Sequence, residues 1–131
     1  MSEQDNVARL VKVYEAFGRG DVPYIIDQLT DDVAWTTHLD PIVPWSGSYH
    51  GKAEVPGFFA AIAGTADVTA FAPTEFVAQR DTVVSLGEFG IKVKATGKTN
   101  LARWVFIWKF REGRVCSYEQ FHDAAIAEAF R

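Results

Sequence analysis

Residues 99–110 (TNLARWVFIWKF) alternate between two unlike sets of side chains, and no other stretch constrains the fold as strongly. Successive side chains of a β-strand point to opposite faces, so residues two apart share a face. One face is aromatic and the other is aliphatic and basic: Trp104, Phe106, Trp108 and Phe110 against Leu101, Arg103, Val105, Ile107 and Lys109. A strand that is apolar on both faces is typical of the centre of a sheet. The aromatic row is therefore expected to cover a deep core or to line an apolar pocket.

The composition indicates one domain, residues 1–131, with an unusually aromatic interior. Aromatic residues make up 14% of the chain and apolar residues 48%, which favours an aromatic-lined cavity or a covered interface. The net charge of -4, without a cluster of Lys and Arg, excludes a nucleic-acid partner. Cys116 is the single cysteine, so no internal disulfide can form.

Membrane and export signals are absent from the sequence pattern. No apolar run is long enough to span a bilayer. The first ten residues lack the basic segment and the apolar segment that together mark a secretory signal. We therefore expect a cytoplasmic protein without a membrane partner.

The first half of the chain carries helical patterns. Ser2 and Asp5 form a capping box for a first helix, which Gly18 ends. Its apolar residues recur every three or four positions and predict one buried stripe: Val7, Leu10, Val11, Tyr14 and Phe17. Asp21 is the expected N-cap of a short second helix, and residues 52–63 are predicted to form a third.

The second half reads as β-structure. Pro73 is expected to break one strand in two, and residues 40–51 are predicted to be a loop because they hold two prolines and two glycines. Strands are predicted over residues 33–38, 68–72, 74–79, 83–95, 99–110 and 115–121. Asp123 would cap a final helical turn. Helices followed by antiparallel strands indicate an α+β fold, in which a curved antiparallel sheet forms a cone (an α+β barrel) covered by N-terminal helices.

The order of these elements and four short motifs resemble the SnoaL-like branch of the nuclear transport factor two-like superfamily. The motifs are GRGD at 18–21, LTDDVAW at 29–35, GSYHG at 47–51 and FHDAA at 121–125. The superfamily includes ketosteroid isomerase, polyketide cyclases and limonene epoxide hydrolase. The resemblance implies the conical fold and a small hydrophobic ligand or substrate, and we expect no cofactor.

The catalytic carboxylates of these relatives do not carry over to this sequence. Alignment with the isomerase places the base at Thr37 and the oxyanion aspartic acid at Phe106. The cyclase aspartate aligns with Gln120, whose amide cannot abstract a proton. Arg103, the counterpart of the epoxide-hydrolase arginine, falls on the outer face without two acidic partners. Whether the chain is an enzyme therefore stays open.

The same alignment predicts which side chains bind the ligand: Trp35, Thr37, Phe89, Trp104, Phe106, Trp108, Tyr118 and Gln120. His122 and Asp40 are the catalytic candidates, because an imidazole or a carboxylate at a pocket rim can move a proton. The alternatives are a rim histidine bonded to backbone and an Asp-Pro turn residue. His38, Asp40 and His50 lack the spacing of metal ligands, so no metal site is predicted.

The outer face of the central strand suggests a partner. Leu101, Val105, Ile107 and Phe121 would form an exposed apolar patch, which on a soluble protein usually meets a second copy, so we expect a homodimer. Three functions are compatible with the sequence. The first is a small-molecule-binding protein with isomerase-, cyclase- or hydrolase-type activity on a polyketide, steroid or terpenoid. The others are a non-catalytic ligand-binding module and a dimeric scaffold whose aromatic side chains fill the cavity.

Overall fold

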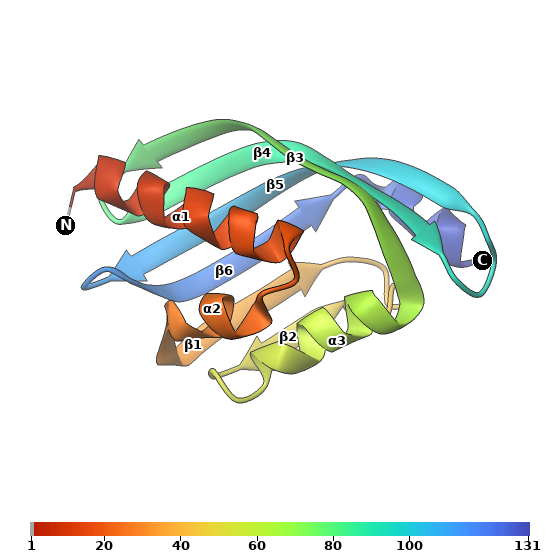
Figure 1. Cartoon of the computed structure of the whole chain (residues 1–131), viewed down its shortest axis with the longest axis horizontal. Helices are drawn as coiled ribbons and strands as arrows, with labels where there is room; N and C mark the ends of the chain where they lie inside the picture. The colour runs from red at the N-terminus through yellow and green to blue at the C-terminus, as the bar shows by residue number, and fades with distance from the viewer. Residues whose placement is uncertain (1) are drawn as a thin grey trace.

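The computed structural model describes residues 2–131, and it has the α+β architecture expected from the sequence. Within that range the elements follow the order α1 (Glu3–Gly18), α2 (Val22–Asp27), β1 (Leu29–His38), β2 (Gly47–His50), α3 (Val55–Thr65), β3 (Ala66–Gln79), β4 (Thr82–Val93), β5 (Thr99–Arg111), β6 (Arg114–His122) and the 3-10 helix η1 (Ala124–Phe130). The three α-helices lie on the same side of the sheet (Figure 1). No helix among the described residues is long and apolar enough to cross a membrane.

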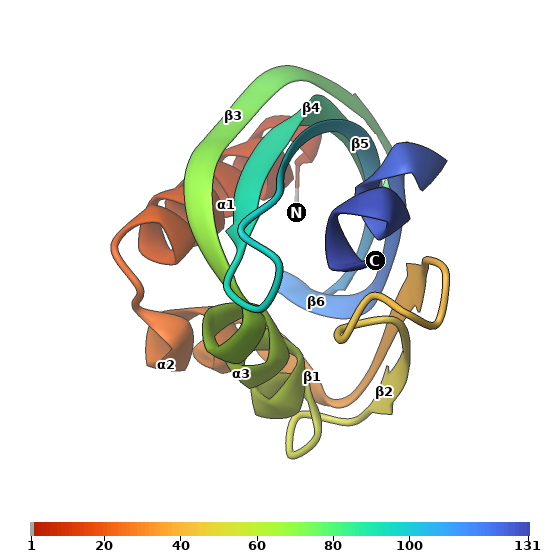
Figure 2. The same ribbon diagram turned by 90° about the vertical axis from the view of Figure 1, so that its right-hand side faces the viewer.

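The six strands form one curved sheet in the order β2-β1-β6-β5-β4-β3. The sheet bends around a central space without closing on itself, as the view along its axis shows (Figure 2). All neighbouring strands are antiparallel except β1 and β6, which run parallel. This pair departs from the expected antiparallel sheet. Its two strands are joined through most of the chain, so no hairpin turn forces them to run in opposite directions.

β5 lies inside the sheet between β4 and β6, which confirms the position predicted from its alternation. Its aromatic face is buried, whereas Leu101 on the other face is 60% exposed. The same register places Phe89 of β4 and Gln120 of β6 on the buried, concave side of the sheet. The core of the molecule therefore lies between this aromatic surface and the helices.

The predicted start of α1 is confirmed, but its predicted buried stripe is wrong at one position. Ser2 Oγ accepts a hydrogen bond from the Asp5 amide at 3.0 Å, and Asp5 Oδ2 accepts one from the Ser2 amide at 3.3 Å. Val11 is 41% exposed, while Val13 is buried in its place. The helix packs with its Leu10, Val13 and Tyr14 side against the core, which turns Val11 toward the space between α1 and β3.

β3 and the segment before α3 also differ from the prediction. Pro73 does not break β3, because β3 is an edge strand and the register shifts between Pro73 and Glu75, where no amide proton is needed. Residues 47–50 pair with β1 as strand β2 instead of forming only a loop. Asp123 does not cap η1 with its side chain. Its Oδ2 accepts the Arg103 amide of β5 at 3.0 Å.

Candidate functional site

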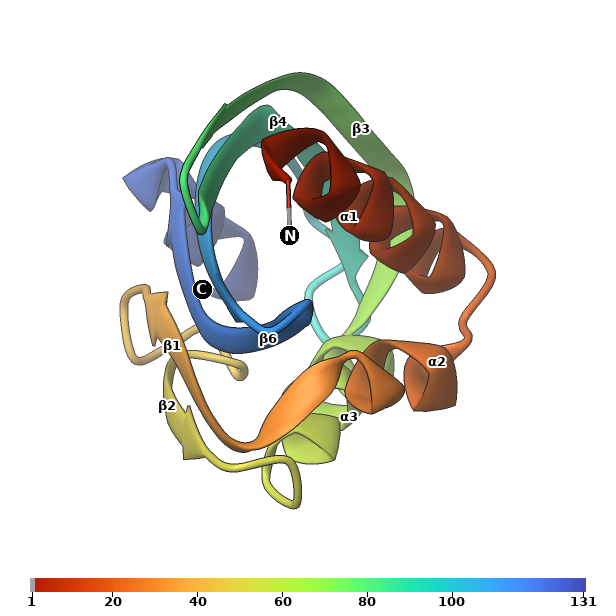
Figure 3. The same ribbon diagram turned by 90° about the vertical axis from the view of Figure 1, so that its left-hand side faces the viewer.

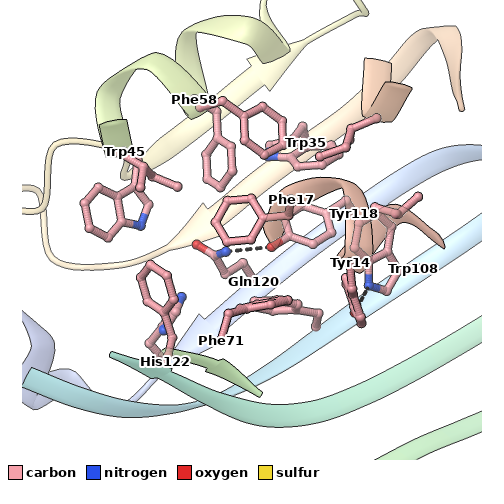
Figure 4. A pocket seen from close by; sticks show the side chains of 16 residues that line it. Tyr14, Phe17, Trp35, Trp45, Phe58, Phe71, Trp108, Tyr118, Gln120 and His122 are labelled. Carbon is pink, nitrogen blue, oxygen red and sulfur yellow. Dashed lines mark hydrogen bonds between the residues drawn. The ribbon is translucent and has the colours of Figure 1, made fainter. Parts of the chain in front are cut away.

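A cavity of about 40 Å³ lies between the concave face of the sheet and the helices. Figure 4 shows the sixteen side chains that line it, and none of them is Asp, Glu, Lys or Arg. Seven were predicted from the sequence as ligand-binding or catalytic candidates: Trp35, Phe89, Phe106, Trp108, Tyr118, Gln120 and His122. The fold thus brings together residues from four different strands.

Most of the cavity wall consists of aromatic rings in direct contact. The rings of Trp35 and Tyr118 lie 4.0 Å apart between centroids, and those of Trp108 and Tyr118 lie 4.4 Å apart. Phe71 packs edge-on against Phe17 at 4.9 Å. Such ring pairs stabilise the fold beyond the area that they bury, so much of the cone is filled by the protein itself.

Tyr14 belongs to a polar network whose bonds all lie inside the protein. Its hydroxyl accepts a hydrogen bond from Trp108 Nε1 at 2.9 Å and shares a second with Ser85 Oγ. Burial raises the pKa of the Tyr14 hydroxyl far above its ordinary value of 10.0, so the group stays protonated. Tyr14 therefore ties α1 to β4 and β5, and no polar atom of it is left over for a ligand.

The opposite end of the cavity holds polar atoms without a protein partner. Gln120 Nε2 donates to the Tyr118 hydroxyl at 2.6 Å, which leaves Gln120 Oε1 unpaired. Both ring nitrogens of His122 and Nε1 of Trp45 are also buried and unpaired. In Figure 4 the amide oxygen of Gln120 faces the side of the cavity where Trp45 and His122 lie. Either orientation of the amide leaves one of its polar atoms facing this space.

His122 is neutral in this environment. Burial lowers its pKa from 6.5 to about 4, and the negative charge of Asp123 opposes that effect only in part. The rings of Phe89 and Phe106 lie 5.8 and 5.9 Å from the imidazole. A neutral imidazole has one N–H donor and one nitrogen acceptor, so His122 can donate and accept at the same time.

Three other predicted residues do not line this cavity. Thr37 is buried, but its Oγ1 donates to the Trp45 carbonyl at 2.8 Å and so holds the loop that carries Trp45. The Trp104 ring stacks on Phe106 at 3.8 Å, behind the cavity wall. Asp40 lies at the surface, where it accepts the Ile42 amide and pairs with Arg131 at 3.4 Å. Of the two catalytic candidates, His122 therefore lines this cavity and Asp40 does not.

Trp45 brings an unpaired polar atom into the cavity, and reasoning from the sequence missed this contribution. It is fully buried although it comes from the segment between β1 and β2, and its ring packs against Phe130 of η1 at 5.5 Å. A tryptophan directly after a proline in a polar loop was the available signal, since so large an apolar ring is seldom left in water. Residues 2–131 contain no group of three or more His, Cys, Asp or Glu side chains that could hold a metal ion.

The curved sheet, the covering helices and the aromatic cavity define a protein of the nuclear transport factor 2-like class. A model of the SnoaL-like domain matches residues 10–118, and the chain belongs to this family. A comparison with curated protein sequences finds no match.

Solved structures of similar proteins support the same assignment. A nuclear transport factor 2-like protein of unknown function from Burkholderia pseudomallei is 30% identical, with a TM-score of 0.83 over 96% of this chain and 95% of that one. A protein of this type from Burkholderia xenovorans is 28% identical, with a TM-score of 0.89 over 100% and 99%. TerC, crystallised with polyporic acid, is 25% identical, with a TM-score of 0.82 over 96% and 98%.

Proposed function

We propose that this chain binds a small, uncharged and largely apolar molecule, and that an oxygen-bearing group of the molecule sits between Trp45, Gln120 and His122. The observation that carries the proposal is the set of unpaired polar atoms at this end of an otherwise aromatic cavity. A buried polar atom without a partner costs about 1–3 kcal/mol, so a ligand that pairs with several of them gains affinity. Small-molecule binding is also the general role of the SnoaL-like family.

The pairing pattern narrows the chemistry of the ligand. Trp45 Nε1 and one nitrogen of His122 donate, while Gln120 Oε1 and the other nitrogen of His122 accept. A ligand with a hydroxyl next to a carbonyl supplies both complements. The absence of charged side chains among the lining residues disfavours ionised ligands. Oxygenated polyketides, steroids and terpenoids satisfy these requirements.

Binding without turnover is the better-supported form of this function. The lining residues include no carboxylate, and a histidine with a pKa of about 4 is a weak base at neutral pH. Isomerase-type proton transfer is the second candidate. It is favoured by one observation, the two unpaired nitrogens of His122 at the place where a ligand oxygen would lie.

Methyl ortho-hydroxyphenyl ketone is a suitable first probe, because it places a hydroxyl beside a carbonyl on one aromatic ring. Calorimetric titration is expected to show binding that the His122→Leu substitution weakens about five- to tenfold, the loss of one or two hydrogen bonds. His50→Leu is the matched control, since His50 lies exposed on β2. Equal affinities of the wild type and His122→Leu would contradict the proposed site.

The same probe separates binding from catalysis. Proton transfer next to the carbonyl would exchange the methyl hydrogens of the ketone for deuterium in heavy water, which NMR detects. We expect no exchange above that of the His122→Leu variant. Exchange that depends on His122 would instead establish the isomerase-type candidate.

We further propose that the chain forms a homodimer through the outer face of the sheet. Leu101 and Phe121 are 60% and 38% exposed there, beside the half-buried Val105 and Ile107. Sedimentation equilibrium at micromolar concentration is expected to give twice the chain mass, and Leu101→Glu is expected to give the monomer. Val11→Glu, on the helical side of the molecule, should leave the dimer intact. A monomeric wild type would refute this interface.

A further inference from the structure

The cavity is too small for the kind of ligand that its walls would otherwise accept. One buried water needs about 10–15 Å³, so a volume of about 40 Å³ holds about three waters or one small polar group. Pockets for organic ligands usually measure about 300–1,000 Å³. A ligand that reaches His122 with its polar end must therefore find space for the remainder of the molecule elsewhere.

A groove that provides this space runs between α1 and β3, which lie side by side (Figure 3). Its volume is about 550 Å³. Val11 and Val68 line it and are 41% and 42% exposed, and Phe76 contributes a third apolar wall. Because α1 turns Val11 away from the core, the helix itself creates one side of this groove.

The groove and the cavity share two walls, Tyr14 and Phe71. Tyr14 is held in place by its bonds to Ser85 and Trp108. Phe71 is only half-buried, and as a phenylalanine it has no polar atom to anchor it. The pairing of β3 with β4 also shifts register on both sides of Phe71, between Val68 and Ala70 and between Pro73 and Glu75. Phe71 is therefore the shared wall without a polar anchor. Its displacement costs ring contacts, such as those with Phe17 at 4.9 Å and Trp104 at 5.4 Å, which an apolar ligand can replace.

We propose that the α1–β3 groove is a second subsite, which binds the apolar tail of the same ligand whose oxygen-bearing end lies at His122, with Phe71 displaced between them. This inference rests on the proposed function. The occupant is an uncharged alkyl chain or hydrocarbon ring system, because the groove is mainly apolar. Its single charged side chain among the described residues, Glu15, would repel an anionic tail. The ligand is thus an elongated molecule with a hydroxyl-carbonyl head and a hydrocarbon tail.

A series of ortho-hydroxyphenyl ketones with methyl, propyl, pentyl and heptyl chains tests the subsite. If the chain lies in the groove, affinity is expected to rise about two- to fourfold for each added methylene that becomes buried. Val11→Asp should abolish this dependence of affinity on chain length. Val77→Asp is the control: Val77 is an exposed valine of β3, outside the groove.

The outcomes separate this inference from the proposed function. Failure of every ketone to bind refutes the proposed function. If the methyl ketone binds but longer chains do not raise the affinity, the subsite alone is refuted. The same holds if the affinity rises with chain length as much in Val11→Asp as in the wild type. The NMR signals of the Val11 methyl groups provide a test without substitution. The heptyl ketone should shift them more than the methyl ketone does, whereas equal shifts would overturn the proposal.

Discussion

Acidification from about pH 7 to about pH 4.5 is expected to lower the free energy of unfolding by about 2 kcal/mol through His122 alone. The pKa of His122 is about 4 in the folded protein and about 6.5 in an unfolded chain. Between these values the unfolded chain binds a proton that the folded protein does not, so stability rises with pH. The contribution is complete above about pH 6.5 and is lost as the pH falls toward 4.

Urea unfolding across this pH range measures the effect. Carboxyl groups in general also titrate in this range, so the wild type must be compared with the variant His122→Gln. The pH dependence of the variant is expected to be flatter by about 2 kcal/mol over the interval. His50→Gln, which removes an exposed imidazole, should follow the wild type. Parallel curves for the wild type and His122→Gln would show that His122 is not buried in its neutral form.

Replacement of Gly87 by alanine is expected to destabilise the fold by about 2–3 kcal/mol, the upper part of the range for overpacking a core. A Cβ atom at this position would clash with Cζ2 of Trp104 and would meet the carbonyl oxygen of Ala72 at 2.5 Å. The indole of Trp104 lies over the backbone of β4 at Gly87, where no side chain is in the way. Gly87 pairs directly with Trp104 in the sheet. Neither the ring, which is stacked on Phe106, nor the backbone of β3 can yield freely.

Gly64→Ala is the matched control for this substitution. Gly64 lies in α3, and nothing is within 4 Å of a Cβ added there. Because alanine favours a helix by up to about 1 kcal/mol over glycine, this variant should be as stable as the wild type or more so. Thermal unfolding followed by tryptophan fluorescence compares the two. A Gly87→Ala variant with wild-type stability would mean that Trp104 does not occupy this hollow.

Features that depend on neighbours in the chain were predictable. The alternation of residues 99–110 placed β5 inside the sheet, and Ser2 with Asp5 marked the start of α1, because both patterns arise from the local geometry of one element. The motif order identified the family and, through it, the curved sheet. Seven cavity residues followed from the same alignment.

Features that depend on packing between different segments could not be predicted from the sequence. Val13 is buried in place of Val11 because of the way α1 is rotated about its axis against the sheet. The spacing of apolar residues in α1 does not by itself decide between these two rotations. Pro73 continues β3 because that strand is at an edge, a fact about the whole sheet. The entry of Trp45 into the cavity depends on Thr37, eight residues away, and on Phe130 of η1, far away in the chain.

The sequence by itself determined the family, the aromatic face of the central strand and the lack of a transferable carboxylate base. Tertiary structure alone decided which polar groups meet. It brought Gln120 and His122 together with Trp45, left their polar atoms unpaired, and put Asp40 at the surface. The reason is that hydrogen-bond pairing, burial and the pKa of His122 are set by groups that contact one another only after folding.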